Sequence, residues 1–232
     1  MILCLETATE VCSVALCGQA GVISLKESTE QKSHATMLTV FIDEILKEKN
    51  IKVKDLEAVA VSKGPGSYTG LRIGVSVAKG MAFAGSIPLI GIDTTLSMFW
   101  GLSEKFRNIH ETGLDTLFCP MLDARRMEVY YAIYDINGLI IKSIAAEIIT
   151  ESTFSEIPES TKIIFFGDGA MKCKGIINQK NAYFADDYRI SAASMQKPVY
   201  VAHSYHQYED VAYFEPFYLK DFITSIPKKN IL

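Results

Sequence analysis

The chain has 232 residues, with 23 Lys and Arg against 27 Asp and Glu, and a net charge of −4. This acidic balance argues against a stand-alone nucleic-acid-binding protein, which needs a basic face. The apolar runs are far shorter than the roughly 20 residues that cross a bilayer, and the opening residues, MILCLE, lack the charged segment of a secretory signal. We therefore expect a cytoplasmic protein with no membrane contact.

The five cysteines and four histidines do not follow a metal-binding pattern. Cys4, Cys12 and Cys119 lie in apolar, strand-like segments, and no pair of cysteines has C-x-x-C spacing. His203 and His206 are three residues apart but belong to no H-E-x-x-H motif. We predict reduced, structural cysteines and no metal site.

The first half of the chain predicts strands followed by alternating helices and strands. Apolar residues recur at helical spacing between Ser33 and Lys49, and a further helix starts at Thr94 or Thr95 and ends near Lys105. A polar turn at residues 6–10 and a hairpin turn at residues 18–21 separate the first strands. Short apolar runs predict strands at residues 2–5, 11–17, 22–27, 58–61 and 87–92.

A glycine-rich loop stands at the centre of this half. The stretch Gly64-Pro65-Gly66-Ser67-Tyr68 predicts a tight turn, because glycine allows positive φ and proline fixes its own φ. The following helix has Ser67 or Thr69 as its N-cap. A strand, a glycine loop and a helix N-terminus together offer backbone N–H groups to an anion.

The helix after this loop carries a stripe of small residues. Gly70, Gly74, Ala78 and Ala82 recur every four residues and therefore share one face. Each interior glycine costs about 1 kcal/mol relative to alanine, so close approach of another helix is expected to offset the loss. That second helix belongs either to this chain or to another subunit.

The second half repeats the order of the first. Glu6 aligns with Asp123 at the same offset that aligns Gly21 with Gly138, which predicts an internal duplication. A connection is predicted from Asn108 to residue 115. Helices are predicted from about residue 169 to 178 and from 191 to 206, before an extended tail at 215–219. Strands are predicted at residues 117–122, 128–134, 139–149 and 163–166.

Polar turns of the two halves are candidates for a shared cleft. The hydroxyls of Thr7 and Thr9 suit a phosphate, and the Glu6 carboxylate suits a hydrated magnesium ion. An ordinary polar hairpin turn is the alternative interpretation. The sequence from Asp123 to Arg126, DARR, presents either an acid and two bases at the cleft or a surface ion-pair turn.

Five stretches together resemble the TsaB (YeaZ) family of bacterial tRNA threonylcarbamoyladenosine biosynthesis proteins. The resemblance implies a two-lobed actin/hexokinase/Hsp70-like (ASKHA) fold of duplicated ribonuclease-H-like topology: an α/β protein with mixed sheets flanked by helices. We expect an N-terminal lobe at 1–106 and a C-terminal lobe at 107–232, with part of the last 40 or so residues packing back on the first lobe. The stretches are LETATEVCSVAL (5–16), KGPGSYTGLRIGVSVAKGMA (63–82), PLIGIDTTLSM (88–98), DARRMEVYYAIY (123–134) and EPFYLK (215–220).

The resemblance implies a non-catalytic scaffold or activator role in t6A synthesis. TsaB-like proteins accompany TsaD, the paralogue that transfers threonylcarbamoyl to adenosine 37 of tRNAs reading codons that start with A. A TsaE-like ATPase joins the complex, which uses ATP and Mg, whereas this chain is expected to bind no cofactor and to meet tRNA only indirectly. The resemblance also implies a homodimer in isolation, and its helix 70–84 gives the expected partner or dimer interface: Gly70, Arg72, Ile73, Gly74, Val75, Val77, Ala78, Met81 and Ala82.

One departure from the family pattern bears on a nucleotide site. Glu6 stands where the family motif usually begins with aspartate, and the longer acid weakens the case for a bound metal. A small ATP-dependent kinase or ATPase of the same fold remains the alternative function. The sequence contains no arrangement of residues typical of a metalloprotease. The degenerate phosphate-loop positions that such an enzyme would use are Glu6, Thr7, Thr9, Gly64, Gly66, Ser67 and Asp123.

Overall fold

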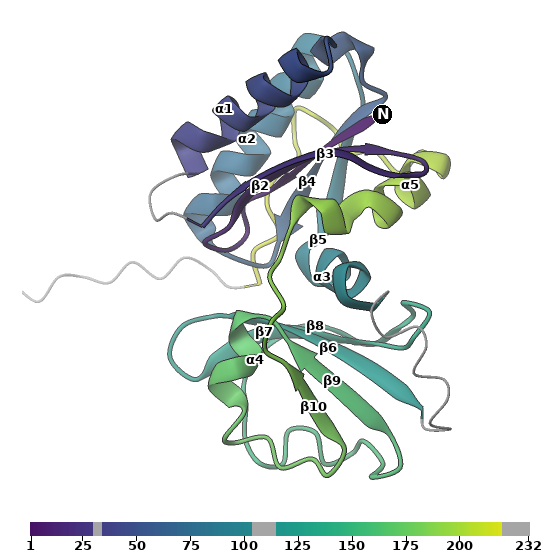
Figure 1. The fold of residues 1–232 in the computed structure, drawn as a ribbon. Coiled ribbons are helices and arrows are strands. Elements are labelled where there is room, and N and C mark those ends of the chain that lie inside the picture. The colour runs from purple at the N-terminus through teal and green to yellow at the C-terminus, as the bar shows by residue number, and fades with distance from the viewer. Residues whose placement is uncertain (30–33, 104–114, 220–232) are drawn as a thin grey trace, which may run out of the picture.

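The computed structural model describes residues 1–29, 34–103 and 115–219 (Figure 1). The expected cap at Ser33, the helix end at Lys105, nearly all of the connection from Asn108 to residue 115 and the lobe boundary after residue 106 lie outside these residues. Within them, none of the helices is both long and apolar enough to cross a membrane.

The first sheet has five strands in the order β3-β2-β1-β4-β5. The central strand β1 pairs antiparallel with β2 and parallel with β4. All five strands were predicted, although β4 extends three residues beyond the apolar run, into the glycine loop. The strands are β1 (Ile2–Glu6), β2 (Cys12–Gly18), β3 (Gly21–Ser28), β4 (Ala58–Gly64) and β5 (Leu89–Asp93).

Helices cover both faces of this sheet because its central strands are apolar on both sides. The helices α1 (His34–Glu48) and α2 (Tyr68–Gly85) lie side by side on one face (Figure 1). The other face packs against a 3-10 turn, η3 (Ala192–Met195), and α5 (Gln196–Ser204). The helix predicted from 191 to 206 is therefore a 3-10 turn followed by a shorter α-helix. A second 3-10 turn, η1 (Val53–Asp55), precedes β4.

The second sheet repeats the topology of the first, in the order β10-β9-β6-β7-β8. Read from the opposite edge, this order matches the first sheet strand for strand, so the predicted duplication is confirmed. In the first half a helix follows the third strand, whereas in the second half turns at 150–158 stand in its place. The strand β10 was not predicted from the sequence. The strands are β6 (Thr116–Asp123), β7 (Glu128–Tyr134), β8 (Ile140–Ile148), β9 (Lys162–Phe166) and β10 (Ala182–Ala185).

The helix α3 (Thr94–Ser103) lies between the two sheets (Figure 1). Its buried Phe99 packs edge-on against Phe118 of β6, with ring centroids 5.3 Å apart, and contacts Tyr134 of β7 at 5.2 Å. The short helix α4 (Asp168–Cys173) covers the other face of the second sheet and ends five residues before the predicted end at 178. The two sheets are thereby connected through aromatic packing as well as through the chain.

The last described residues run back over the first sheet. Glu209 forms a β-bridge with Leu89, and Phe214 is buried in the core between α1, α2 and that sheet. The Lys79 ammonium of α2 donates hydrogen bonds to the carbonyls of Ala212 (3.2 Å) and Phe214 (2.9 Å). This segment is thus fixed to α2 at several points.

Candidate functional site

The turn after β1 contains a buried carboxylate. Glu6 is fully buried; its carboxylate accepts hydrogen bonds from the Ala8 N–H (2.7 Å) and from the Ser62 hydroxyl. Burial raises the pKa of Glu6 from 4.5 to about 7, because the hydrogen bonds compensate only partly for lost hydration. The expectation that Glu6 presents its carboxylate to a cleft ion is wrong, since the side chain closes an internal contact between β1 and β4.

The small-residue stripe of α2 packs against this same turn. The Thr7 hydroxyl donates to the Gly70 carbonyl (2.8 Å), and a Cβ at Gly70 would lie less than 3.0 Å from the Thr7 carbonyl oxygen. A Cβ at Gly74 would overlap the Thr7 hydroxyl, and one at Gly66 would overlap Ala8. Gly70 and Gly74 therefore pack against the β1–β2 turn of the same chain, whereas Ala78 and Ala82 lie in the core that α2 shares with α1 and the first sheet.

Two N–H groups at the start of α2 are engaged within the chain. The Ser67 N–H donates to the Ala8 carbonyl (2.7 Å), and the Gly70 N–H donates to the Ser67 hydroxyl (3.3 Å). Ser67, and not Thr69, is the N-cap. Gly64 has a φ of +123° and lies against the Phe217 carbonyl, so a side chain there would be strained and obstructed. A phosphate bound at this loop would need the N–H groups of Ser67 and Gly70 as hydrogen-bond donors.

The outward face of α2 is distinct from the small-residue stripe. Phe83 is 81% exposed, and a Cβ added at Gly80 would have no atom within 4 Å. Ile73, Val77, Gly80 and Ala84 follow the spacing i, i+4, i+7, i+11 and share this face. Of the predicted interface residues, Arg72, Ile73, Val77 and Met81 keep exposed or partly exposed side chains, whereas the others are buried within the chain: Gly70, Gly74, Val75, Ala78 and Ala82.

Gly80 and Phe83 lie in the predicted interface helix 70–84 but were not among the interface residues named from it, although a signal was present. The helix is apolar nearly all round, which indicates burial on more than one side. The regular stripe at Gly70 and Gly74 placed buried residues in the predicted interface beside exposed or partly exposed ones such as Arg72 and Val77. Spacing shows which residues share a face, but it does not show which face meets the chain's own core.

Arg72 is held at the start of the outward face by two tyrosines. Its guanidinium lies 4.5 Å from the centroid of the Tyr68 ring, and its Nε donates to the Tyr218 hydroxyl (3.2 Å). The two tyrosine rings are 5.1 Å apart. The C-terminal segment therefore contributes an aromatic residue to the same surface as α2.

A cleft of about 530 Å³ lies between the two halves of the chain. It brings together Thr9 and Asp123, as the duplication predicted, whereas Glu6 and Thr7 are fully buried and do not line it. Asp168 also lines it, and burial raises the pKa of this carboxyl. The lining residues are Thr9, Glu10, Val11, Thr29, Met98, Leu122, Asp123, Gly167, Asp168, Met171, Asp186, Tyr188, Arg189 and Ile190.

Two of the carboxylates that line this cleft already have partners. Asp123 forms an ion pair with Lys172 and accepts the Arg125 N–H (2.7 Å). Asp168 accepts the N–H groups of Asp123 (3.0 Å) and Gly169 (2.9 Å). Among the described residues, no group of three His, Cys, Asp or Glu side chains has a geometry that fits a metal ion.

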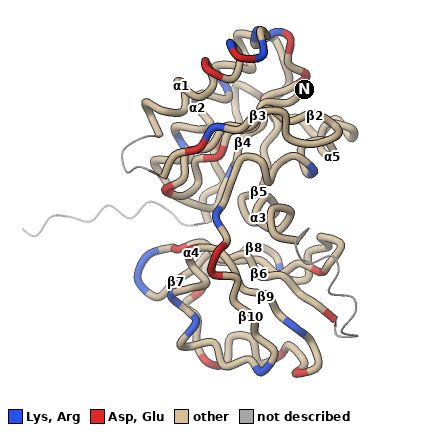
Figure 2. The backbone as a smooth tube through the Cα atoms, in the orientation of Figure 1, with Lys and Arg blue, Asp and Glu red and all other residues tan. Residues whose placement is uncertain are grey.

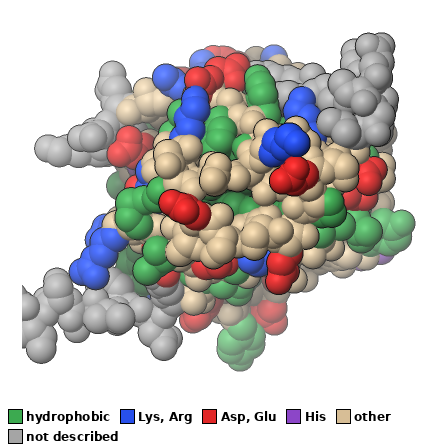
Figure 3. Space-filling view, turned by 90° about the horizontal axis from the view of Figure 1, so that it is seen from below, with side chains coloured by type: hydrophobic (Ala, Val, Ile, Leu, Met, Phe, Trp, Pro, Cys, Tyr) green, Lys and Arg blue, Asp and Glu red, His purple; other side chains and the backbone are tan. Residues whose placement is uncertain are grey.

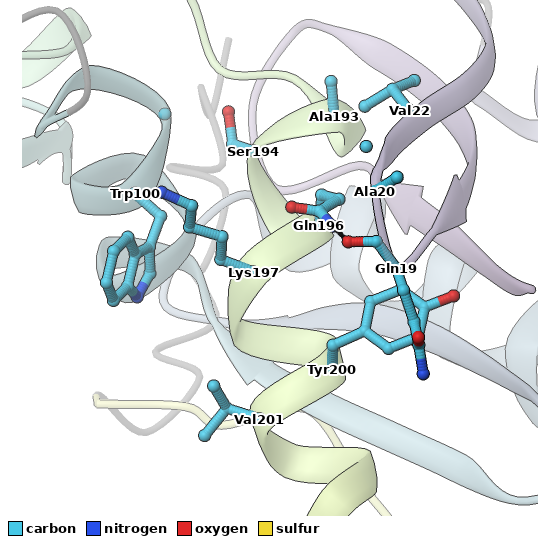
Figure 4. A pocket seen from close by; sticks show the side chains of 12 residues that line it. Gln19, Ala20, Val22, Trp100, Ala193, Ser194, Gln196, Lys197, Tyr200 and Val201 are labelled. Atoms are coloured by element: carbon cyan, nitrogen blue, oxygen red, sulfur yellow. Dashed lines mark hydrogen bonds between the residues drawn. The ribbon is translucent and has the colours of Figure 1, made fainter.

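A second concavity, of about 680 Å³, contains none of the predicted site residues (Figure 4). It lies between α3, α5 and the β2–β3 hairpin. Lys197 extends toward Trp100, with its ammonium 5.2 Å from the ring centroid, and the Gln196 amide donates to the carbonyls of Gly18 and Gln19 (both 3.0 Å). Its polar groups therefore mainly join α5 to the hairpin and to α3.

The distribution of surface charge does not indicate a large binding site for a polyanion. On the described part of the face in Figure 3, Lys and Arg side chains are interspersed with Asp and Glu. This distribution agrees with the net charge of −4. The described part of this face therefore has no continuous basic patch of the kind that binds a polyanion.

Comparison with known proteins identifies related chains. A model of the TsaD family, described as tRNA N6-adenosine threonylcarbamoyltransferase, matches residues 27–213. The tRNA threonylcarbamoyladenosine biosynthesis protein TsaB of Escherichia coli is 36% identical over 140 residues, which is 60% of this chain and 57% of that protein. TsaB of Haemophilus influenzae is 34% identical over 131 residues, which is 56% of this chain and 52% of that protein. The chain thus covers little more than half the length of these relatives.

A solved structure extends the similarity to nearly the whole fold. YeaZ from Pseudomonas aeruginosa superposes with a TM-score of 0.76 over 94% of this chain and 99% of that chain, at 23% identity. At this identity the superposition establishes the fold, which is the two-sheet α/β arrangement predicted from the sequence.

Proposed function

Because the chain belongs to the TsaD family and is similar to its TsaB (YeaZ) members, we propose that it is a non-catalytic subunit of the t6A machinery. It acts by binding a TsaD-like subunit that transfers threonylcarbamoyl to tRNA. In isolation the same surface pairs two copies of the chain, and a TsaE-like ATPase joins the assembly. The chain itself binds no cofactor in this proposal.

The observation that carries the proposal is the outward face of α2. Gly80 lies in the interior of an 18-residue helix, and no atom of the chain lies within 4 Å of where its Cβ would be. Alanine at this position would make the helix more stable by about 1 kcal/mol. An interior glycine with no neighbour in its own chain is explained by a partner that approaches the backbone closely. The half-buried Ile73 and Val77 flank it, and Phe83 supplies a large exposed aromatic side chain of the kind that anchors interfaces.

The interior of the chain supports a binding role over a kinase or ATPase. The β1–β2 turn packs directly against the glycine loop and the first turn of α2, so it occupies the space where a phosphate would bind. The Glu6 carboxylate is buried. A nucleotide phosphate would have to displace hydrogen bonds that now join β1 to α2. These contacts instead make the loop a rigid support for the outward face.

Gly80→Arg tests the docking face. The substitution places a long charged side chain where the partner must approach, while the helix gains a residue of better propensity. We expect affinity for the TsaD-like partner, measured by isothermal titration calorimetry, to fall at least about 30-fold, the size of a typical hot-spot loss.

Val201→Arg is the matched control. Val201 is 53% exposed on α5, across the sheet from α2, so the substitution introduces the same side chain on an unrelated surface. We expect its affinity to stay close to that of the unmodified chain. Unchanged binding by Gly80→Arg, with circular dichroism showing a folded protein, contradicts the proposed interface.

A further inference from the structure

The turn between β6 and β7 presents two adjacent arginines. Arg125 and Arg126 are exposed, and this turn is the blue loop that projects beside α4 and β7 in Figure 2. It closes through hydrogen bonds from the Ala124 N–H to the Glu128 carbonyl (3.1 Å) and from the Glu128 N–H to the Arg125 carbonyl (3.2 Å). The two guanidinium groups therefore extend from neighbouring residues of an ordered hairpin.

Both arginines have a left-handed backbone. The φ angle is 68° at Arg125 and 51° at Arg126. The left-handed conformation is disfavoured for residues with a β-carbon, and glycine and asparagine adopt it most readily. Arginine at both positions is unfavourable for the fold, and a strained backbone maintained in this way points to a use for the side chains.

The charges around the turn leave the two arginines unbalanced. Lys172 pairs with Asp123 and donates to the carbonyls of Arg126 (2.9 Å) and Glu128 (2.6 Å). The surface ion pair predicted at this turn is therefore present, but Asp123 forms it with Lys172 and with neither arginine. Within the described part of the chain, neither Arg125 nor Arg126 forms a salt bridge with a carboxylate. With the carboxylate of Glu128 counted as well, residues 123–128 and Lys172 carry three positive and two negative side chains, an excess of one positive charge.

The chemistry of this tip fits a phosphodiester backbone. Each guanidinium carries five N–H donors in a planar fork that matches the oxygens of a phosphate. Four carboxylates and one basic residue, Arg189, are among the residues that line the neighbouring cleft, and this excess of negative charge disfavours a nucleotide polyphosphate there. An exposed, projecting pair of guanidiniums instead suits consecutive phosphates of a polymer, which position a nucleic acid without reading its sequence.

We propose that the Arg125–Arg126 turn contacts the phosphate backbone of RNA and orients it on the assembly. Only the identification of that RNA as tRNA rests on the proposed function; the phosphate contact follows from the turn itself. The inference departs from the expectation that this chain meets tRNA only indirectly. It is compatible with the acidic net charge, since the contact involves two residues and not a broad basic face.

The test is tRNA binding over a salt series, followed by fluorescence anisotropy of labelled tRNA. It uses the full chain, both alone and in complex with its TsaD-like partner. We expect Arg125→Gln/Arg126→Gln to weaken binding about tenfold at low salt. The slope of log affinity against log salt should fall by about 1.4 to 1.8, the contribution of two phosphate contacts. Lys174→Gln/Lys180→Gln removes the same charge from two exposed lysines and should leave the slope unchanged.

A second variant separates RNA binding from folding. Arg125→Asn/Arg126→Gly installs residues that adopt a positive φ more readily than arginine does, so we expect a higher melting temperature together with the same loss of tRNA binding. An unchanged slope in the Gln variant overturns the inference, and the proposed function stands if light scattering still shows the complex. If the Gln variant instead loses ATP–Mg binding while its RNA salt slope is unchanged, the turn binds a nucleotide, and the RNA inference is again overturned. Failure of the complex to form contradicts the proposed function instead, and the series with the chain alone still tests the turn.

Discussion

Adding one methyl group at Gly70 is expected to destabilise the chain by about 3 kcal/mol, at the upper end for overpacking of a core. A Cβ there would lie less than 3.0 Å from the Thr7 carbonyl oxygen. That oxygen belongs to a buried turn, and the Thr7 hydroxyl is itself bound to the Gly70 carbonyl. Neither element can move away without breaking the contact between β1 and α2. Urea unfolding of Gly70→Ala measures the loss.

Gly80→Ala is the matched control on the same helix. No atom of the chain lies within 4 Å of the new Cβ, so only helix propensity changes, and we expect a gain of about 1 kcal/mol. Opposite signs for the two substitutions establish that the small-residue stripe faces inward. Equal stabilities for Gly70→Ala and the unmodified chain would contradict the packing described here. Gly74→Arg, which would keep the chain folded if the stripe faced outward, is expected to unfold it.

The buried Glu6 is expected to make stability depend on pH. Folding raises its pKa from 4.5 to about 7, so between these values the folded chain keeps a proton that the unfolded chain releases. Stability is therefore highest below pH 4.5 as far as this group is concerned, and it falls by about 3 kcal/mol as the pH rises to 7. Urea unfolding at a series of pH values measures this slope.

Glu6→Gln removes the titration but keeps the hydrogen bonds. Its amide oxygen can accept from the Ala8 N–H, and its NH2 group can donate to the Ser62 hydroxyl. We expect the variant to be more stable than the unmodified chain at pH 8 by an amount approaching about 3 kcal/mol, with a shallower pH dependence. Glu10→Gln, at an exposed position of the same turn, should change neither. A Glu6→Gln protein that is less stable at pH 8 would mean that the carboxylate is ionised and needed in the folded chain.

The duplicated fold could be predicted because its signals are local and repeated. Apolar runs, glycine turns and a constant offset between Glu6 and Asp123 each depend on neighbouring residues. Two elements of the second half were not predicted correctly from the sequence. The strand β10 has only four residues and is mostly not buried, and the helix expected up to residue 178 stops at Cys173. Tertiary pairing with β9, which no local pattern reveals, is what defines β10.

The candidate site was only partly predictable because it depends on long-range packing. A hydroxyl- and acid-rich turn looks the same in sequence whether it faces a cleft or, as at Glu6 and Thr7, a buried contact with α2. The stripe at Gly70 correctly indicated close approach, but helical periodicity does not identify the neighbour. The left-handed backbone at Arg125 and Arg126 was invisible for a related reason, since it follows from the hairpin register and not from residue type.

The most direct test of the docking role is size-exclusion chromatography with light scattering on the full chain, alone and mixed with its TsaD-like partner. The proposal predicts a dimer alone that converts to a 1:1 heterodimer on mixing, and a Gly80→Arg protein that stays monomeric in both samples. This pattern would place both associations on the outward face of α2. An unmodified chain that stays monomeric and does not associate with the partner would contradict the scaffold function.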